Sequence, residues 1–147
     1  MKTVRLIVGK GHNPFSKAIR LFTDSRWSHI GLCAGDYVYE SVFPVGVVKT
    51  PLTEFKERYK GDWEIIEVVV ANDDRVYTKA KELLGCGYDH FGVFGLALRL
   101  NLSHSKRYQC AEYIATCLGV REDKCFKATP EGIWLYRGIT IMKGDKM

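Results

Sequence analysis

The sequence predicts the α+β class, with helices packed against an antiparallel sheet. Strand patterns dominate the first half of the chain, most clearly the β-branched runs "TVRLIVG" at 3–9 and "WEIIEVVV" at 63–70. Helical patterns follow from residue 73, and "GITIM" at 138–142 returns to a strand. We therefore expect a sheet of about five or six strands. The length suits a single domain spanning residues 1–147.

The first helix and hairpin have recognisable patterns. "FSKAIRLFTD" places Phe15, Ile19 and Phe22 at helical spacing, which predicts a short amphipathic helix. The stretch Ser25–Ser41, "SRWSHIGLCAGDYVYES", predicts two strands around a tight Ala-Gly-Asp turn. We expect this hairpin to lie in the centre of the sheet.

The later elements are marked by start and stop signals, such as a proline at the first helical position, acidic first turns and terminal glycines. One of these helices, at 88–100, is weakened by Gly92 and Gly95. Helices are expected at 51–59, 73–85, 88–100, 108–119 and 129–136, with a further strand at 45–50.

The composition is that of a soluble globular protein, with 46% hydrophobic and 27% charged residues. The formal charge of +5 comes from scattered basic residues, so we expect no nucleic-acid partner. The longest apolar stretch, "FGVFGLALRLNL", contains Arg99 and is shorter than the roughly 20 residues that cross a bilayer. Without a recognisable export signal, we expect a cytoplasmic protein with no membrane span. The oligomeric state is left open.

The cysteines favour free thiols over disulfides or metal ligands. There are five of them, an odd number, so a complete disulfide framework is impossible. No C-x-x-C pair occurs, and the four histidines are not spaced as zinc ligands, so we expect no metal and no other cofactor. The five are Cys33, Cys86, Cys110, Cys117 and Cys125.

Cys110 is the candidate nucleophile. A catalytic thiol works as a thiolate, which is favoured at a helix N-terminus, where unpaired N–H groups and the macrodipole attract negative charge. In "KRYQCAEYIATCLG", loop residues precede Cys110 and a helix follows it, whereas Cys117 falls in the last helical turn. We expect Cys117 and Cys33 to pack in the core, and we see no evident partner for Cys86 or Cys125.

His29 is the candidate base, and Glu40 the candidate group that orients its ring. Alternation along the strand places Trp27, His29 and Gly31 on one face, where Trp27 would contact the substrate. Glu40, on the return strand, could accept the second imidazole proton.

Structural alternatives are open for these residues. A lone strand histidine is more often structural, Glu40 could be a solvated surface residue, and His90 competes as the base. We interpret the two other histidines, His12 and His104, as structural or solvent-facing.

Four short blocks together resemble the permuted NlpC-type papain-like hydrolases, the YiiX-like group. In order they are "WSHIGL…DYVYES", "GYDHFG", "YQCAEYIA" and "TPEGIWLY", scattered over residues 25 to 137. In permuted members the histidine hairpin precedes the cysteine helix, as it does here. The order and spacing of the blocks are more specific than any single block. The resemblance implies a circularly permuted papain-like fold.

Carried over residue by residue, the resemblance makes Cys110 the nucleophile, His29 the general base and Glu40 the orienting acid. Tyr88, in "GYDHFG", matches a tyrosine that lies near the cleft in relatives, so we expect it to bind substrate. The family often has "CSE" where this chain has "CAE", with Ala111 in place of serine. This departure matters little if the backbone N–H of Cys110 is the oxyanion donor.

The implied activity is that of a thiol hydrolase or acyltransferase acting on an amide or ester. The expected substrate is a peptide, a peptidoglycan fragment or an acyl-lipid, and the sequence does not choose among them. Two alternatives belong to other classes. The chain could be an inactive relative that binds peptides or acyl ligands in the same cleft, or a structural protein with Cys110 buried and no groove beside it.

Overall fold

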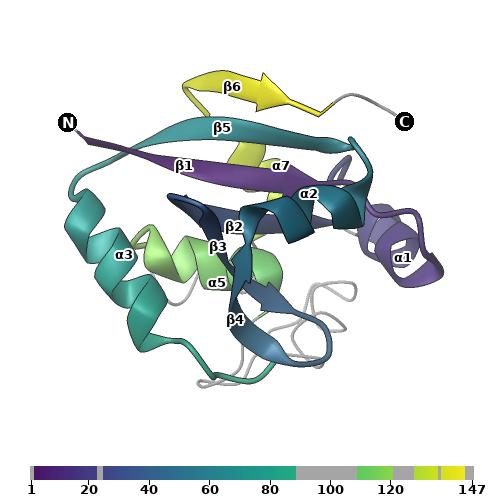
Figure 1. Cartoon of the computed structure of the whole chain (residues 1–147), viewed down its shortest axis with the longest axis horizontal. Helices are drawn as coiled ribbons and strands as arrows, with labels where there is room; N and C mark the ends of the chain where they lie inside the picture. The colour runs from purple at the N-terminus through teal and green to yellow at the C-terminus, as the bar shows by residue number, and fades with distance from the viewer. Residues whose placement is uncertain (1, 23–24, 89–108, 121–127, 136, 145–147) are drawn as a thin grey trace.

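The fold is a six-stranded antiparallel sheet with helices on both faces, seen in a computed structural model that describes residues 2–22, 25–88, 109–120, 128–135 and 137–144. The strand order is β4-β3-β2-β1-β5-β6, and every neighbouring pair is antiparallel. This confirms the α+β prediction and places β2 in the interior of the sheet (Figure 1). The strands are β1 (Lys2–Gly9), β2 (His29–Ala34), β3 (Tyr37–Val42), β4 (Gly46–Pro51), β5 (Trp63–Val70) and β6 (Ile139–Lys143).

The helices form where start signals and helical spacing predict them. Pro51 is a small difference: it is the last residue of β4 and precedes the helix, with extended backbone angles, rather than being the first helical residue. The helix predicted at 88–100 lies, apart from Tyr88, outside the described residues. The described helices are α1 (Pro14–Phe22), α2 (Leu52–Tyr59), α3 (Asp73–Glu82), α5 (Cys110–Cys117) and α7 (Pro130–Leu135).

The two faces of the sheet bury separate apolar clusters. On β2, Ile30 and Leu32 belong to the larger cluster, which also contains residues of α3, α5 and α7. Cys33 points to the opposite face, where a smaller cluster forms around Phe55 of α2. This alternation follows from the period of two in a strand. The sheet therefore separates α5 from α2.

The start of β2 is fixed by hydrogen bonds to the end of β1. The backbone N–H of Ser28 donates to the carbonyl of Gly9 at 3.0 Å, and the Ser28 hydroxyl accepts from the N–H of Gly11 at 2.8 Å. At the other end, Gly35 turns the chain into β3 with a φ of 61°. The predicted hairpin is confirmed, and His29 is the first residue of its first strand.

Residues 85–86, which follow α3, are hydrogen-bonded to Val47 of β4. Val47 donates its N–H to the carbonyl of Cys86 at 2.8 Å, and Gly85 donates to the carbonyl of Val47 at 3.0 Å. Gly46 has a φ of 110°, and a Cβ there would lie 2.8 Å from the Cα of Gly87. The absence of a side chain at Gly46 thus allows the segment leading to Tyr88 to approach β4.

We predict that Gly46→Ala destabilises the protein strongly, because it adds both backbone strain and a backbone clash. The expected loss is roughly 3 kcal/mol in the free energy of unfolding. Urea denaturation followed by circular dichroism measures this loss. Gly35→Ala is the matched control: its φ is also positive, but no atom lies within 4 Å of the added Cβ, so about 1 kcal/mol is expected. Equal losses in the two variants would contradict the packing argument.

Candidate active site

His29 and Glu40 meet on the α2 face of the hairpin. The Nε2 atom of His29 is 2.7 Å from Oε1 of Glu40, whose side chain is completely buried. A Cβ at Gly31 would overlap Cγ1 of Val38 in β3, whereas Cβ of Glu40 would lie at an ordinary contact distance of 3.5 Å, so the glycine is needed for the packing of β2 against β3. Glu40 is therefore not the solvated surface residue that was the alternative to its pairing with His29.

Arg58 of α2 completes the environment of the carboxylate, and the sequence reasoning missed it. One guanidinium nitrogen donates to Oε1 of Glu40 at 2.7 Å and the other to Oε2 at 3.1 Å. Burial raises the pKa of Glu40, but the hydrogen bonds and charges of His29 and Arg58 outweigh it and lower this pKa from 4.5 to about 2. Glu40 is thus an ionised carboxylate shared by two cationic partners.

Two aromatic side chains of α2 confine the imidazole. The rings of His29 and Tyr59 are stacked, with centroids 6.1 Å apart and an interplanar angle of 18°. The ring of Phe55 lies 5.8 Å from that of His29. Arg58 and Tyr59 follow Phe55 by three and four residues, so each lies on the same face of α2 as Phe55. An arginine on the same helical face as a buried phenylalanine was the signal in "TEFKERY" that could have identified Arg58.

Cys110 is the first residue of α5, at the N-terminus predicted for it. The preceding residue, Gln109, caps the helix: its Oε1 accepts from the N–H of Ala111 at 3.0 Å, and its Nε2 donates to the carbonyl of Ala128 at 3.1 Å. The Sγ atom of Cys110 is 3.8 Å from the carbonyl oxygen of Ser28 and 3.7 Å from Oε1 of Gln109. The thiol is therefore next to the residue that precedes His29.

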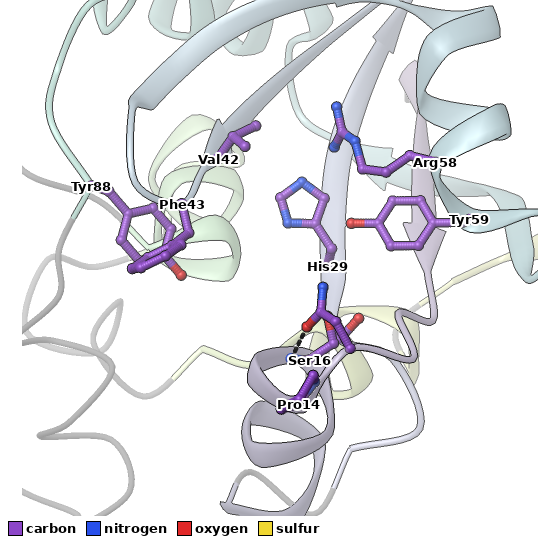
Figure 2. A pocket seen from close by; sticks show the side chains of 10 residues that line it. Pro14, Ser16, His29, Val42, Phe43, Arg58, Tyr59 and Tyr88 are labelled. Atoms are coloured by element: carbon purple, nitrogen blue, oxygen red, sulfur yellow. Dashed lines mark hydrogen bonds between the residues drawn. The ribbon is translucent and has the colours of Figure 1, made fainter.

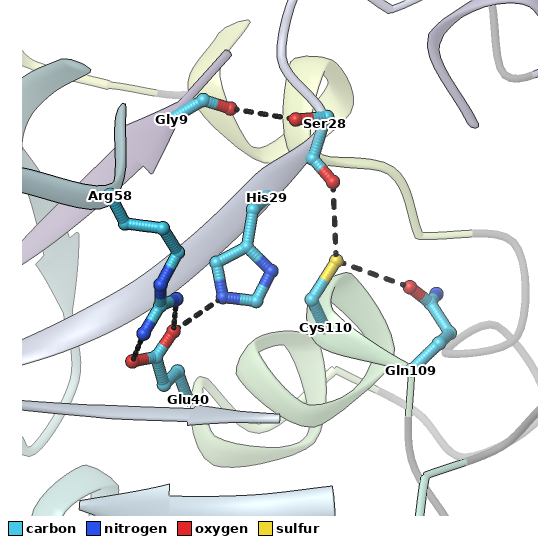
Figure 3. Close-up of polar contacts among 7 residues, drawn as sticks. All are labelled: Gly9, Ser28, His29, Glu40, Arg58, Gln109 and Cys110. Atoms are coloured by element: carbon cyan, nitrogen blue, oxygen red, sulfur yellow. Dashed lines mark hydrogen bonds and ion pairs between the residues drawn. The ribbon is translucent and has the colours of Figure 1, made fainter. Parts of the chain in front are cut away.

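The imidazole of His29 lies between the carboxylate of Glu40 and the thiol of Cys110 (Figure 3). Burial lowers the pKa of His29, whereas Tyr59, Cys110 and Glu40 raise it, and the result is well above the ordinary 6.5. Burial also raises the pKa of Tyr59 above 10, so Tyr59 is a neutral phenol at neutral pH. We attribute the raised pKa of His29 to Cys110 and Glu40.

A pocket of about 480 Å³ opens beside His29. Figure 2 shows Arg58 and Tyr59 of α2 on one side of the imidazole, with Val42 and Phe43 at the end of β3 on another side. Tyr88 also borders the pocket, and its ring meets that of Phe43 edge to face at 5.6 Å. The structure thus places Tyr88 at the candidate site. The pocket has a polar side and an apolar, aromatic side.

Trp27 lies away from this pocket. Its side chain is buried in the larger apolar cluster, 6.3 Å from the ring of Trp134 in α7, whereas His29 contacts the α2 face. The prediction that Trp27 and His29 share one face of a strand is wrong, because β2 begins at His29 and Trp27 precedes it. Strand alternation does not extend back to Trp27.

The remaining cysteines and histidines of the described regions are not part of this cluster. Burial raises the pKa values of Cys33 and Cys117 to about 12, so both are neutral thiols. Cys86 is half-buried and packs against the larger cluster. His12 is exposed and lies 2.6 Å from Asp62. The residues Cys125, His90 and His104 lie outside the described parts of the chain.

Comparison with solved structures finds chains of similar fold. The chain is similar to the crystal structure described as metalloprotein YiiX from Escherichia coli O157:H7, with a TM-score of 0.59 and 25% sequence identity. The match covers 79% of this chain and 63% of YiiX, so the chain spans less than two thirds of that protein's length. This supports a YiiX-like relation. No family model matches the sequence, and no curated protein matches it either.

Two further findings concern the described residues. None of their helices is long and apolar enough to cross a membrane. Within the same parts of the chain, no group of three or more His, Cys, Asp or Glu side chains is arranged to hold a metal ion.

We predict that ionised Glu40 stabilises the fold above about pH 4.5, and that this contribution is lost as the pH falls through about 2. The sign follows because the folded pKa lies below the unfolded one. Glu40→Gln should therefore lower the free energy of unfolding by ~3 kcal/mol at pH 7, with a difference from wild type that shrinks towards pH 2. Urea denaturation at several pH values measures it.

Glu57→Gln is the control for this prediction, since Glu57 is an exposed carboxylate on the same helix as Arg58. It should leave the pH dependence of stability unchanged. A Glu40→Gln protein whose deficit is constant from pH 7 to pH 2 would show that the Glu40 charge does not stabilise the fold.

Proposed function

We propose that this protein is a cysteine hydrolase that cleaves an amide or ester through a thioacyl-enzyme, with the sheet and α5 in a circularly permuted papain-like arrangement. Cys110 is the nucleophile, His29 the general base and Glu40 the orienting acid. The observation that carries the proposal is the position of the His29 imidazole, between a buried carboxylate and a thiol at a helix N-terminus. Similarity to YiiX and the order of the sequence blocks support it.

The proposed reaction starts from an imidazolium beside a thiolate. The raised pKa of His29 favours the protonated ring at neutral pH, and the positive ring together with the N-terminus of α5 favours negative charge on Cys110. Oε1 of Glu40 accepts a hydrogen bond from the Nε2–H of His29. The other ring nitrogen, Nδ1, is then the one that exchanges a proton with the thiol. Arg58 is a positioning residue, because its two hydrogen bonds fix the carboxylate that orients His29.

In the first half of the reaction, the thiolate of Cys110 attacks the carbonyl carbon and a C–S bond forms. The carbonyl oxygen becomes negative, and the N–H of Cys110 at the start of α5 is the proposed donor to it. The N–H of Ala111 is not available for this role, since Gln109 accepts from it. The imidazolium then gives its proton to the leaving nitrogen or oxygen as that bond breaks.

In the second half, a water molecule attacks the thioester carbon. His29, now neutral, takes a proton from the water, and the C–S bond breaks. The acid leaves, and the thiolate and imidazolium are restored. An alcohol or amine in place of water would give acyl transfer by the same steps.

The pocket beside His29 is where the proposed substrate binds. Its apolar side at Val42, Phe43 and Tyr88 suits an apolar acyl or side-chain group, and its polar side at Arg58 suits a carbonyl or hydroxyl. A peptide, a peptidoglycan fragment or an acyl-lipid each offers both kinds of group.

The description of YiiX as a metalloprotein raises the question of a metal here. The donor set around His29 does not fit one, since both oxygens of Glu40 are bound by Arg58 and one of them also by His29. The described residues also contain no cluster of three or more suitable ligands. The mechanism above is accordingly derived from Cys110, His29 and Glu40 alone.

A ligand-binding protein without catalysis is the second candidate. The exposed fraction of Cys110 is only 2%, and the described residues that border the pocket include His29 but not Cys110. A ligand could therefore occupy the pocket without touching the thiol. Thiol reactivity separates the two candidates.

We predict that iodoacetamide alkylates Cys110 faster than any other cysteine at pH 6, since its thiolate is stabilised by His29. His29→Ala should slow this labelling by roughly 100-fold, because an ordinary cysteine ionises only near pH 8.5. Glu40→Gln should have a smaller effect, acting through the orientation of the ring. Brief alkylation followed by peptide mapping measures each rate.

His12→Ala is the matched control, because His12 is exposed and pairs with Asp62 rather than with the site. It should label like the wild type. The catalytic assignment is wrong if Cys33, Cys86 or Cys125 reacts first, or if Cys110 reacts equally fast without His29. Rapid labelling of Cys110 without release of p-nitrophenol from p-nitrophenyl acetate above that of Cys110→Ala would favour the binding protein.

A further inference from the structure

A second pocket, of about 240 Å³, lies at the end of the sheet where β1 and β6 end and β5 begins. Its frame is held by backbone hydrogen bonds: the N–H of Lys10 donates to the carbonyl of Asp62 at 2.9 Å, and that of Gly144 to the carbonyl of Trp63 at 2.8 Å. Among the described residues, none borders both this pocket and the pocket beside His29. The reaction proposed above does not use it.

Three cationic side chains border this second pocket: Lys10, Arg26 and Lys143. Within the parts of the chain that the structure describes, none of the three forms an ion pair with a carboxylate. The guanidinium of Arg26 lies over the ring of Trp134, 4.7 Å from its centroid. Stacking uses the flat face of a guanidinium and leaves its N–H edge available to an anion.

The two carboxylates at the same pocket already have donors. Oδ2 of Asp62 is 2.6 Å from Nε2 of His12. Oε1 of Glu64 accepts from Nε1 of Trp134 at 3.3 Å. Among the described residues, the lining therefore combines three cations without ion pairs and two acids that each have one oxygen engaged, which leaves a net positive pocket.

Trp27 provides an independent observation that points to a ligand. Trp27 is 6% exposed, it borders this pocket, and its indole Nε1–H has no hydrogen-bond acceptor in the parts of the chain that the structure describes. A buried donor without an acceptor costs about 1–3 kcal/mol, so such groups are rare in folded proteins. Nε1 itself is buried, so an anion in the pocket would supply the missing acceptor once a rotation of the indole exposes this atom.

We propose that this pocket binds the anionic group of a small molecule, a carboxylate or a phosphate, with Trp27 donating its indole N–H and Lys10, Arg26 and Lys143 supplying positive charge. Charge-assisted hydrogen bonds of this kind are stronger than neutral ones. The site is separate from Cys110, so this proposal does not depend on the proposed hydrolase activity.

The indole N–H signals in a ¹⁵N–¹H NMR spectrum test the proposal directly. The chain has three tryptophans and thus three such signals, of which Trp27→Phe identifies one. Titration with inorganic phosphate at constant ionic strength should shift the Trp27 signal saturably. A parallel titration with acetate separates the two sources: a response to phosphate alone indicates a phosphorylated ligand, and a response to both indicates a carboxylate or phosphate site.

Removing the charges should weaken phosphate binding without removing the reporter. The double variant Lys10→Gln, Lys143→Gln is expected to raise the dissociation constant roughly tenfold or more. Lys81→Gln, an exposed lysine on α3, is the matched control and should bind like the wild type. Cys110→Ala should also bind normally, which keeps the outcome independent of the proposed hydrolase.

Three results would overturn the proposal. The first is no saturable shift of the Trp27 signal, and the second is an equal shift with sodium chloride. The third is an unchanged dissociation constant in the double lysine variant. Trp27→Phe, if folded, gives a further check, since phosphate should then bind more weakly as judged by the Trp63 signal.

Discussion

The fully buried carboxylate of Glu40 is the group on which the arrangement of the site depends. It binds the imidazole of His29 from β2 and the guanidinium of Arg58 from α2, so one side chain joins the hairpin to the helix that covers it. A buried charge is tolerated only when it is paired and hydrogen-bonded, and here both oxygens are. Removing either partner would leave part of that charge uncompensated.

The thiol of Cys110 lies close to the His29–Glu40 pair because Cys110 is the first residue of α5 and His29 is the first residue of β2. The sheet lies between α5 and α2, and Cys110 is on the first turn of α5, beside Ser28 at the start of β2. His29 is at the end of its strand, so its ring can contact α2 on one side and the thiol on the other. A shift of His29 by one position along β2 would separate its ring from the thiol, since strand neighbours face opposite sides.

The sequence predicts the α+β class, the hairpin and the helix that begins at Cys110, because these depend on local periodicity, turn residues and capping. It also pairs His29 with Glu40, since both lie in one hairpin. It does not find Arg58, because its role depends on α2 folding back over the hairpin, which no local pattern specifies. It misplaces Trp27 relative to His29, because the strand begins later than the pattern suggests.

The central claim is that the His29 imidazole is coupled to the Cys110 thiol, and an NMR titration of the imidazole nitrogens tests it most directly. In the wild type, His29 should remain protonated well above pH 6.5, because Glu40 and the thiolate both stabilise its positive charge. In Cys110→Ala its pKa should fall, since one of these groups is gone. A wild-type pKa at or below 6.5 that is unchanged in Cys110→Ala would contradict the account.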